Sequence, residues 1–323
     1  MNIVEFAKLA NLSTATISRA FHEPEKIRTS TRERVLNLAD RMGYYPSASA
    51  RALVKGRHDV LGVVWPLEVE GAGALFAHRF LGAFTQQLVR NDLDLLICPV
   101  DRSQLPTVDH ARRTILRGRC DAWILLYPRH NDALIKALNY GQKPVICVMG
   151  ELKECPTWKF VSLDQNSWIE KALGMLREKG ARRVLFLGCR KEEPDHIARL
   201  ASFYKLEPAY FGSQFIALPD WPLNTEKFRE MLSTGEFDAV IGVDDAAALV
   251  AVKACQQARF AIPERIQIIG IDDSADAAAA VPPLTTFRQP LDEMAACAVD
   301  LALGHRVRSG KFKATLVAGG SVR

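Results

Sequence analysis

The amino-acid sequence predicts an all-α head over residues 1–57, followed by an α/β body of two doubly wound lobes of parallel sheet over residues 58–323. Three observations predict this division. The first segment places apolar residues at helical spacing between short polar turns. The second segment alternates apolar, strand-like runs with amphipathic helices, and this alternation comes in two successive arrays. A chain of 323 residues is long enough for two or three domains.

The first two helices of the head are predicted over residues 3–10 and 14–21. Apolar residues recur at helical spacing in the first helix, and Asn11-Leu12-Ser13 separates it from the second. The Ser13 hydroxyl can accept a free backbone N–H in the next turn, so Ser13 is the predicted N-cap of the second helix. Two short helices joined by about three residues match a helix-turn-helix, whose second helix enters the major groove of DNA.

A third helix and a short following segment complete the head. The capping box Ser30-x-x-Glu33 predicts the start of the third helix, and Gly43 predicts a left-handed stop at its end. The helix-turn-helix domain is therefore expected over residues 1–46. Residues 47–57 have helix-forming composition but are too few for a stable helix in water. We expect a hinge helix there that forms only with a partner or on DNA.

Positive charge is concentrated in the head. Residues 1–57 hold ten Lys or Arg and five Asp or Glu, a net charge of +5 that equals the net charge of the whole chain. The body is therefore close to neutral. A small basic head on a neutral body indicates a partner that is a polyanion. Charge alone leaves open the alternative that this is an ordinary solvated surface.

The remaining composition argues against several other classes of protein. The seven cysteines are scattered without a C-x-x-C pair and without a His at metal-ligand spacing, so we expect reduced, buried thiols and no metal site. No apolar run approaches the roughly 18 residues of a membrane span, and the N-terminus does not resemble a signal peptide. We therefore expect a cytoplasmic protein without a membrane partner.

The body is predicted to contain two arrays of strands and helices. Apolar runs predict strands of the first array at 60–65, 93–98, 122–127 and 144–149, and of the second at 159–163, 183–188, 214–218, 237–243 and 266–271. Helices are expected near 75–91, 107–119 and 131–140, then near 166–179, 195–206, 224–233, 245–260 and 290–304. Ligands of such sheets bind beyond the carboxyl ends of the strands, so we expect a binding cleft between the lobes.

These segments carry a resemblance to a known family. The run VEFAKLANLSTATISRAFHEPEKIRTSTRERVLNLADRMGYYPSASARALVKGR, residues 4–57, resembles the DNA-binding head and hinge of the LacI/GalR family. FDAVIGVDDAAALVAVKA, FAIPERIQIIGIDDSADAA and VPPLTTFRQPLDEMAACAVDLAL resemble motifs of the family's body, which is similar to periplasmic sugar-binding proteins. The resemblance implies a near lobe of residues 58–162 plus 289–314 and a distal lobe of 163–288 plus 315–323.

The resemblance also implies which residues of the head contact DNA. The family's base-reading positions correspond to Thr14, Ala15 and Arg19, and its phosphate-contacting positions to Ser13, Thr16 and Ser18. His22 follows them where an asparagine is usual. Leu53 stands where the family wedges a leucine into the minor groove at the operator centre. Chemistry supports the assignment of Arg19, because arginine binds the O6 and N7 of guanine with two hydrogen bonds. In isolation, Arg19 would be interpreted as a surface salt-bridge residue.

Seven residues of the body are the expected effector contacts. The resemblance implies that Arg199 and Asp272 hold polar groups, that Trp221 stacks on a ring, and that Asp244 bonds a hydroxyl or an amine. Weaker candidates come from the near lobe: Phe76, Tyr127 and Gln289. The alternatives are helix capping for Asp272 and core packing for Trp221. Met149-Gly150 replaces the Asp-Arg of many sugar-binding members, so the ligand need not be a plain hexose.

The expected function is that of a sequence-specific transcriptional regulator, with repression favoured over activation. The resemblance implies a homodimer on a pseudo-palindromic operator with a central C·G step, controlled by a small-molecule effector such as a sugar or sugar derivative, with no cofactor and no enzymatic activity. The alternative is a nicotinamide-dinucleotide-binding redox regulator or enzyme, because Gly71-x-Gly73 follows a strand. Phe76 replaces the third glycine of that fingerprint, which argues against it.

Overall fold

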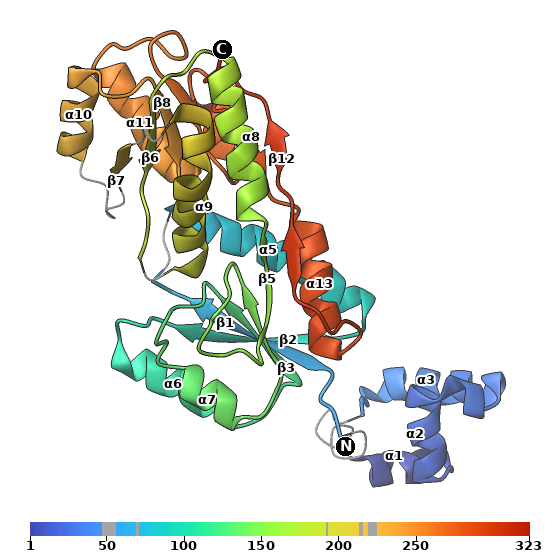
Figure 1. Ribbon diagram of the computed structural model, residues 1–323. Helices are drawn as coiled ribbons and strands as arrows, with labels where there is room; N and C mark the ends of the chain where they lie inside the picture. The colour runs from blue at the N-terminus through green and yellow to red at the C-terminus, as the bar shows by residue number, and fades with distance from the viewer. Residues whose placement is uncertain (47–55, 69–70, 192, 213–215, 219–224) are drawn as a thin grey trace. The chain divides into compact units, whose positions relative to one another are not determined.

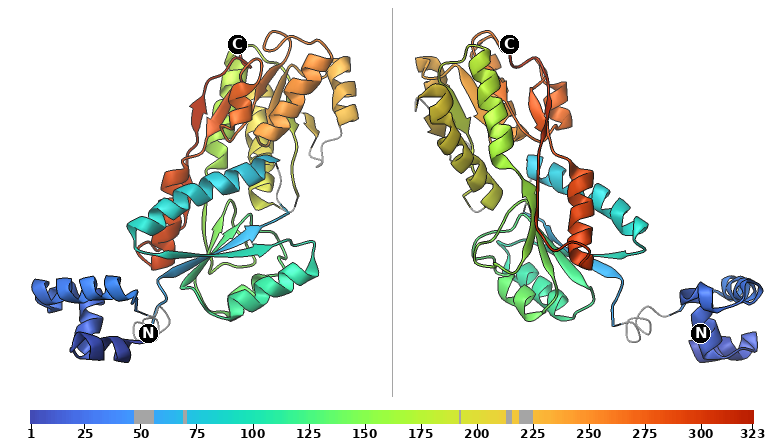
Figure 2. Two further views of the ribbon diagram at one scale, coloured as in Figure 1. Left: turned by 180° about the vertical axis from the view of Figure 1, so that it is seen from behind. Right: turned by 45° about the vertical axis from the view of Figure 1, so that its right-hand side comes forward.

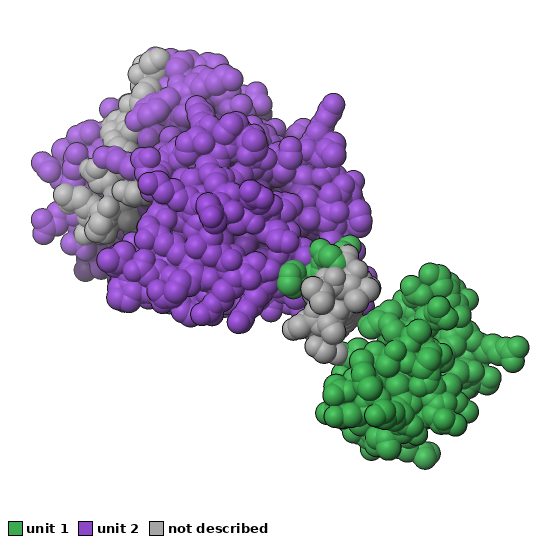
Figure 3. Space-filling view, turned by 90° about the horizontal axis from the view of Figure 1, so that it is seen from below, with its two compact units in different colours: residues 1–59 green, residues 60–323 purple. Residues whose placement is uncertain are grey.

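The computed structural model describes residues 1–46, 56–68, 71–191, 193–212, 216–218 and 225–323 (Figure 1). The side chains of residues 71–74, 216–218 and 225 also lie outside the description. The chain divides into two compact units, residues Met1–Asp59 and Val60–Arg323, which Figure 3 colours separately.

The first unit is a small bundle of short helices. Its elements are α1 (Ile3–Ala10), α2 (Thr14–His22), the 3-10 helix η1 (Pro24–Lys26) and α3 (Thr29–Met42). The side chain of Asn2 accepts the backbone N–H groups of Val4 and Glu5, and the Glu5 carboxylate accepts the N–H of Asn2. The capping box of the head therefore stands at the start of α1.

The predicted capping box at the start of α3 is wrong. The helix begins at Thr29, its N-cap is Arg28, and no side chain caps it. An N-cap residue needs an extended backbone, which Arg28 has, whereas Ser30 already lies inside the helix. The other end is confirmed, because Gly43 has a left-handed backbone with φ of 60° and its N–H bonds back to the last turn.

The core of the head joins all three α-helices. Its buried residues are Phe6, Ala7, Ile17, Ala20, Val35, Ala39 and Tyr44. The rings of Phe6 and Tyr44 stack with centroids 4.2 Å apart. The Arg32 Nε donates a hydrogen bond of 3.2 Å to the carbonyl oxygen of Ala20, which ties α3 to the C-terminal half of α2. These contacts hold α2 by one face and leave its other face uncovered within this unit.

The second unit contains two parallel sheets, and the larger belongs to the near lobe. Within the described residues its strand order is β11-β5-β4-β3-β1-β2, with every neighbouring pair parallel. The bounds are β1 (Val60–Pro66), β2 (Asp94–Val100), β3 (Ala122–Leu126), β4 (Val145–Val148), β5 (Lys159–Leu163) and β11 (Gly310–Phe312).

Helices cover both faces of the near-lobe sheet. Those on one face are α5 (Gly71–Arg90) and α13 (Leu291–Leu303), and those on the other are α6 (Leu105–Leu116) and α7 (Ile135–Tyr140) (Figures 1 and 2). Both faces are therefore apolar, which explains the nearly continuous burial of β3 and β4. None of the described helices is long and apolar enough to cross a membrane.

The smaller sheet forms the distal lobe. Its order is β7-β6-β8-β9, again parallel, from strands β6 (Val184–Leu187), β7 (Ile216–Leu218), β8 (Ala239–Gly242) and β9 (Gln267–Ile269). The helices of this lobe are α8 (Gln165–Glu178), α9 (Pro194–Phe211), α10 (Thr225–Thr234), α11 (Asp245–Gln257) and α12 (Ala275–Ala279). A separate antiparallel pair, β10 (Thr286–Arg288) and β12 (Thr315–Val317), carries the chain between the lobes (Figure 1).

The fold class is confirmed, with one correction to the arrays. The predicted strand at 159–163 does not open the second array, because β5 pairs with β4 of the near-lobe sheet and with β11 from the C-terminal part of the chain. Its apolar character is the same for either sheet, so local sequence could not assign it.

Candidate functional site

Helix α2 presents small and polar side chains on its uncovered face. Ile17 and Ala20 are buried against the rest of the head. Thr14, Ala15, Ser18 and Arg19 are exposed, and Thr16 is half-buried. Because residues three and four apart share one face of a helix, the exposed side chains form a continuous strip. The expected base-reading residues, Thr14, Ala15 and Arg19, all belong to this strip.

The N-terminus of α2 is capped as predicted. Ser13 has an extended backbone and its Oγ accepts the N–H of Thr16 at 3.0 Å, and the two hydroxyl oxygens lie 2.8 Å apart. A helix N-terminus with free N–H groups and hydroxyls favours phosphate. His22 is the last residue of α2 and is half-buried beside Phe21. Leu53 lies outside the described residues.

A small cavity in the body collects most of the expected effector contacts. Residues from both lobes line it: Phe76, Tyr127, Met149, Arg190, Asp195, His196, Arg199, Asp244, Asp272 and Gln289. Six of the seven predicted residues are present, and the seventh, Trp221, lies outside the described residues. The free volume of this cavity is about 10 Å³, which is roughly enough for one water molecule. The cleft is thus nearly closed.

Arg199 is the central cation of the cavity. It projects from α9, is 2 % exposed, and its Nη2 lies 3.1 Å from Oδ2 of Asp195, one turn earlier on the same helix. Its Nη1 donates to the carbonyl oxygen of Val243 at the end of β8. Burial by itself would lower the pKa of Arg199, but the carboxyl groups of Asp195, Asp272 and Asp244 raise it. Arg199 therefore stays charged.

Asp272 has a backbone that few residues adopt. Its φ is 136°, outside the usual regions for a residue with a side chain, which is the kind of strain found at ligand sites. The Arg79 Nη1 of α5 donates to the carbonyl oxygens of Asp272 and Asp273 at 2.8 and 3.0 Å, and the Gln289 amide donates to Asp272 Oδ1 at 2.5 Å. Burial, with the charges of Asp244 and Asp245, raises the pKa of Asp272 well above its ordinary value, although Arg199 opposes the shift.

The capping alternative for Asp272 is wrong. The N-cap of α12 is Ser274, whose Oγ accepts the N–H of Ala277. Asp244, by contrast, both caps α11 through the N–H of Ala247 at 2.7 Å and lines the cavity. Asp245 is fully buried and accepts hydrogen bonds from the Ser274 N–H and the Thr286 hydroxyl, so it holds the turn behind Asp272.

Four cavity residues were missed by reading the sequence: Met149, Arg190, Asp195 and His196. The signal for Asp195 was available, because it precedes Arg199 by four residues and an i, i+4 pair shares a helix face. Arg190 and His196 lie close because the Arg190 N–H donates to Nδ1 of His196 at 3.2 Å, a contact without a sequence pattern. Burial, with the charges of Arg199 and Arg190, lowers the pKa of His196 well below its ordinary value.

A metal ion does not fit the cluster beside the cavity. Glu193, Asp195 and His196 each place one possible ligand atom within 4.8 Å of the others. However, Nδ1 of His196 accepts the Arg190 N–H, so the proton of the neutral ring resides on Nε2. That nitrogen lies 3.5 Å from Glu193 Oε2, and the two atoms do not form a hydrogen bond. A protonated ring nitrogen cannot be a metal ligand.

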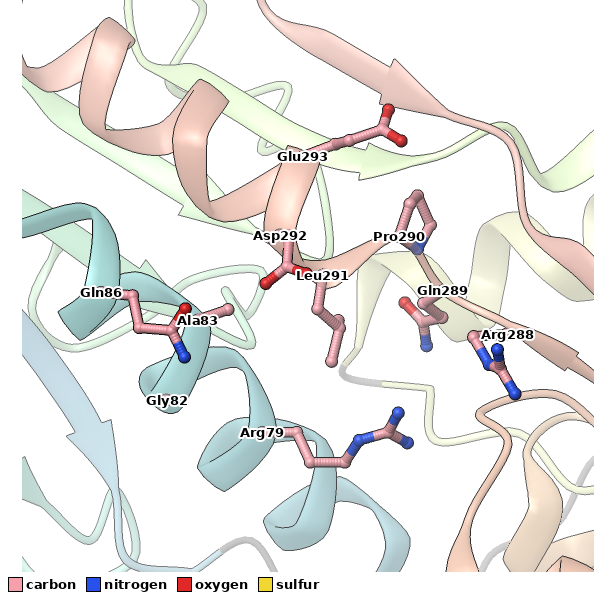
Figure 4. Close-up of a pocket in the computed structure, with 10 residues that line it drawn as sticks. All are labelled: Arg79, Gly82, Ala83, Gln86, Arg288, Gln289, Pro290, Leu291, Asp292 and Glu293. Atoms are coloured by element: carbon pink, nitrogen blue, oxygen red, sulfur yellow. The ribbon is translucent and has the colours of Figure 1, made fainter. Parts of the chain in front are cut away.

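A larger hollow lies on the outer side of the same junction. It has a volume of about 470 Å³ and lies between α5 and residues 288–293, where Arg79 extends from α5 toward Gln289 and Arg288 (Figure 4). Exposed side chains form much of its rim, including Gln86, Arg288 and Asp292. The smaller cavity is the better candidate for the effector site, because the carboxyl ends of β3, β4 and β8 and the buried charges converge there.

The fold, the exposed face of α2 and the small cavity of the body together define a DNA-binding regulator that has an effector domain. Residues 2–47 match the family described as bacterial regulatory proteins, lacI family, and residues 173–317 match a periplasmic binding protein-like domain. The HTH-type transcriptional regulator AscG of Escherichia coli is 28% identical over 90% of this chain and 88% of its own length. GalS of Salmonella typhimurium is 27% identical over 94% and 89%. The chain thus joins a domain of the lacI family of bacterial regulatory proteins to a periplasmic binding protein-like domain, and its relatives are LacI/GalR-type transcriptional regulators.

Solved structures confirm the architecture. The lac repressor bound to ONPG superposes with a TM-score of 0.80 over 100% of this chain and 99% of that chain, at 19% identity. The complex of the regulator CelR with cellobiose gives a TM-score of 0.68 over 99% of each chain, at 22% identity. Both likenesses concern the fold.

The dinucleotide alternative finds no support. Gly71 and Gly73 lie within α5 rather than in a tight turn between strand and helix. The third position of the fingerprint is Phe76, whose ring is buried beside Phe80 and Tyr127. The relatives described above are transcriptional regulators.

Proposed function

We propose that this cytoplasmic regulator binds a pseudo-palindromic operator with a central C·G step as a homodimer, acts as a repressor, and changes its operator affinity when a small polar molecule occupies the body cavity. A sugar or sugar derivative is the favoured class of effector. The observation that carries the proposal is that the cavity is lined from both lobes at once. A ligand there bridges Tyr127 of one lobe and Arg199 of the other, so its binding energy depends on how far the lobes are closed.

The exposed strip of α2 supports the DNA half of the proposal. Arg19 would read a guanine, Thr14 and Ala15 would contact neighbouring base edges, and Ser13, Thr16 and Ser18 would hold phosphates. His22 would contact DNA beyond the end of the helix, and Leu53 would enter the minor groove. The net charge of +5 in the first 57 residues supplies the attraction to a polyanion.

The chemistry of the cavity and the relatives support the effector half. Phe76 and Tyr127 offer aromatic surface with ring centroids 5.7 Å apart, while Arg199, Asp244, Asp272 and Gln289 offer hydrogen-bonding groups. Aromatic and carboxylate groups together suit a polyhydroxylated ring. Solved structures of the same fold hold cellobiose in one case and glucose in another. One relative of 25% identity is described as a repressor.

Two measurements on the full chain test the proposal. Selection from random duplexes should enrich an inverted repeat with a central C·G step, and affinity for that site should fall steeply with salt as counterions are released. A salt-independent affinity would contradict the DNA half. A thermal-shift screen of sugars should find a ligand that raises the Tm and alters operator affinity, because a ligand at 100 times its Kd adds about 2.7 kcal/mol of stability. A stabilising ligand without effect on operator affinity would contradict the regulatory half.

A further inference from the structure

Carboxyl groups outnumber guanidinium groups around the effector cavity. In the described part of the chain, five carboxyl groups lie in the cavity wall or directly behind it: Glu193, Asp195, Asp244, Asp245 and Asp272. Three guanidinium groups face them: Arg79, Arg190 and Arg199. His196 adds no charge, because its pKa is lowered well below its ordinary value by burial and by the two neighbouring arginines. Arg129 also acts on Glu193 but is itself paired with Glu68 at 3.2 Å.

Some of these carboxyl groups have an arginine as their partner, whereas others accept hydrogen bonds from neutral groups only. Arg199 pairs with Asp195 at 3.1 Å and Arg190 with Glu193 at 3.6 Å. Arg79 binds the backbone carbonyl oxygens of Asp272 and Asp273. The carboxyl groups of Asp244 and Asp272 receive neutral donors instead, a backbone N–H and the amide of Gln289.

The cavity wall also has more unsatisfied acceptors than donors. In the described residues that line it, the buried side-chain atoms without a hydrogen-bond partner are Asp195 Oδ1 and Gln289 Oε1, which accept, and Arg199 Nε, which donates. Asp195 and Gln289 are 2 % and 5 % exposed. A buried acceptor without a donor is costly, so a ligand that supplies donors at this point gains binding energy.

A bound cation with N–H groups would balance the carboxyl groups and would also donate to the acceptors that lack a partner. An ammonium group offers three donors, no acceptor and one positive charge. In its absence, burial and the neighbouring carboxyl groups raise the pKa of Asp272 well above its ordinary value, so the charged form of this carboxyl group is disfavoured. The positive charge of a ligand would favour the charged form of Asp272. A neutral hydroxyl could use the acceptors but would bring no positive charge to the carboxyl groups.

We propose that the effector is a sugar-like molecule that carries a protonated amine, as in an amino sugar or an iminosugar, and that the amine is held between Asp244, Asp272 and the free acceptor of Asp195. This inference rests on the proposed function, since it names the chemical class of the ligand for the same cavity. The neutral hydroxyl compounds of the same shape are the competing class.

Matched pairs of ligands test the proposal on the full chain. Glucosamine and glucose, galactosamine and galactose, mannosamine and mannose, and 1-deoxynojirimycin and glucose differ mainly in an amine. At least one amine should raise the Tm, and its neutral partner should bind at least about tenfold more weakly by titration calorimetry, because a desolvated charge pair is lost. If the largest Tm shift comes from a neutral or anionic sugar, or if no amine shifts the Tm, the proposal is overturned.

The same screen separates this inference from the proposed function. A neutral sugar that binds and changes operator affinity would leave the proposed function standing while it overturns the amine. Loss of the proposed function would appear instead as a failure of the selection to enrich any sequence, or as an operator affinity that no bound ligand changes.

Two isosteric variants locate the amine. Asp244→Asn keeps an oxygen that can cap α11, and Asp272→Asn keeps one that can accept from Gln289. Each should weaken binding of the amine at least about tenfold and leave its neutral partner unchanged or tighter, because one negative charge is removed. Asp276→Asn is the matched control, because Asp276 is an exposed residue of α12 away from the cavity, and it should change neither affinity. Amine affinity that persists in both cavity variants would overturn the proposal, and Asp244→Asn decides it alone if Asp272→Asn does not fold.

Discussion

The head and the body use arginine in opposite ways. Arg19 of α2 is exposed, and its proposed partner is a base of the operator. Arg199 of α9 is 2 % exposed and already holds Asp195 and the Val243 carbonyl oxygen. The first arginine can add contacts without losing any, whereas the second must share or exchange the contacts that it has. The difference explains how one chain can combine a preformed DNA-reading surface with a body that responds to its ligand.

Removal of the buried arginine of the body should have the largest effect, and this effect should be on the stability of the body. Arg199→Ala removes the cation between Asp195 and Asp272 and leaves buried carboxyl groups uncompensated. We expect the free energy of unfolding to fall by about 3–5 kcal/mol in urea titrations of the full chain. Arg19→Ala is the matched control and should change stability by less than about 0.5 kcal/mol. Equal losses in the two variants would contradict the contrast between the regions.

The pH dependence of the body sharpens the same contrast. Burial and the neighbouring Asp195 raise the pKa of Glu193 from 4.5 to about 7, although Arg190 and Arg129 oppose the shift. The folded state then binds this proton more tightly than the unfolded chain. Its contribution to stability is complete below pH 4.5 and is lost as the pH rises through about 7. Glu193→Gln should therefore be more stable than the parent chain at pH 8, by about 2 kcal/mol, with a smaller advantage at pH 5.

The difference in unfolding free energy between the parent chain and Glu193→Gln separates the contribution of Glu193 from that of His196. His196 is buried with a lowered pKa, so its contribution rises with pH, but it does so in both proteins. Unfolding curves between pH 5 and pH 8 are the measurement. A stability difference that stays constant over this range would show that Glu193 carries the same charge throughout.

The DNA-reading surface should respond in affinity rather than in stability. Arg19→Ala is expected to cost about 1–3 kcal/mol of operator binding and to relax the preference at a single G·C pair, because the bidentate contact to guanine is lost. Binding to a panel of single-base operator variants measures both effects. A uniform loss on every sequence would mean that Arg19 contacts phosphate.

The smallest expected effect concerns the start of α2. Ser13→Ala removes the side-chain oxygen that accepts the Thr16 N–H and should destabilise the head by about 1 kcal/mol. Ser13→Asp keeps an acceptor at that position and serves as the control for stability, although its negative charge should weaken DNA binding. Thermal unfolding followed by circular dichroism would detect the first change, and operator titration the second.

Much of the molecule was predictable because its signals are local. Ser13 and Gly43 stand where a cap and a left-handed stop are needed, and the apolar runs of β1, β3, β4 and β8 mark buried parallel strands without reference to distant residues. Asp244 follows β8 and Asp272 follows β9, where the carboxyl ends of parallel strands form a binding edge, and the family resemblance selected the same two residues. The roles of these residues in DNA and effector binding remain predictions.

The sequence by itself determined the two-part organisation, the longer helices and strands, and the position of polar residues at the strand ends, because each depends on a pattern over a few residues. The short elements α12, β10, β11 and β12 were not predicted. Only the tertiary structure decided that residues 159–163 pair with β4 and β11, and that Arg190 lies in the cavity with Arg199 and close to His196. The pairing of strands and the excess of carboxyl groups around one cavity depend on contacts between residues far apart in the chain. The strands and helices that make such contacts have the same local composition as many other strands and helices. No short sequence pattern therefore predicts which of them pack together.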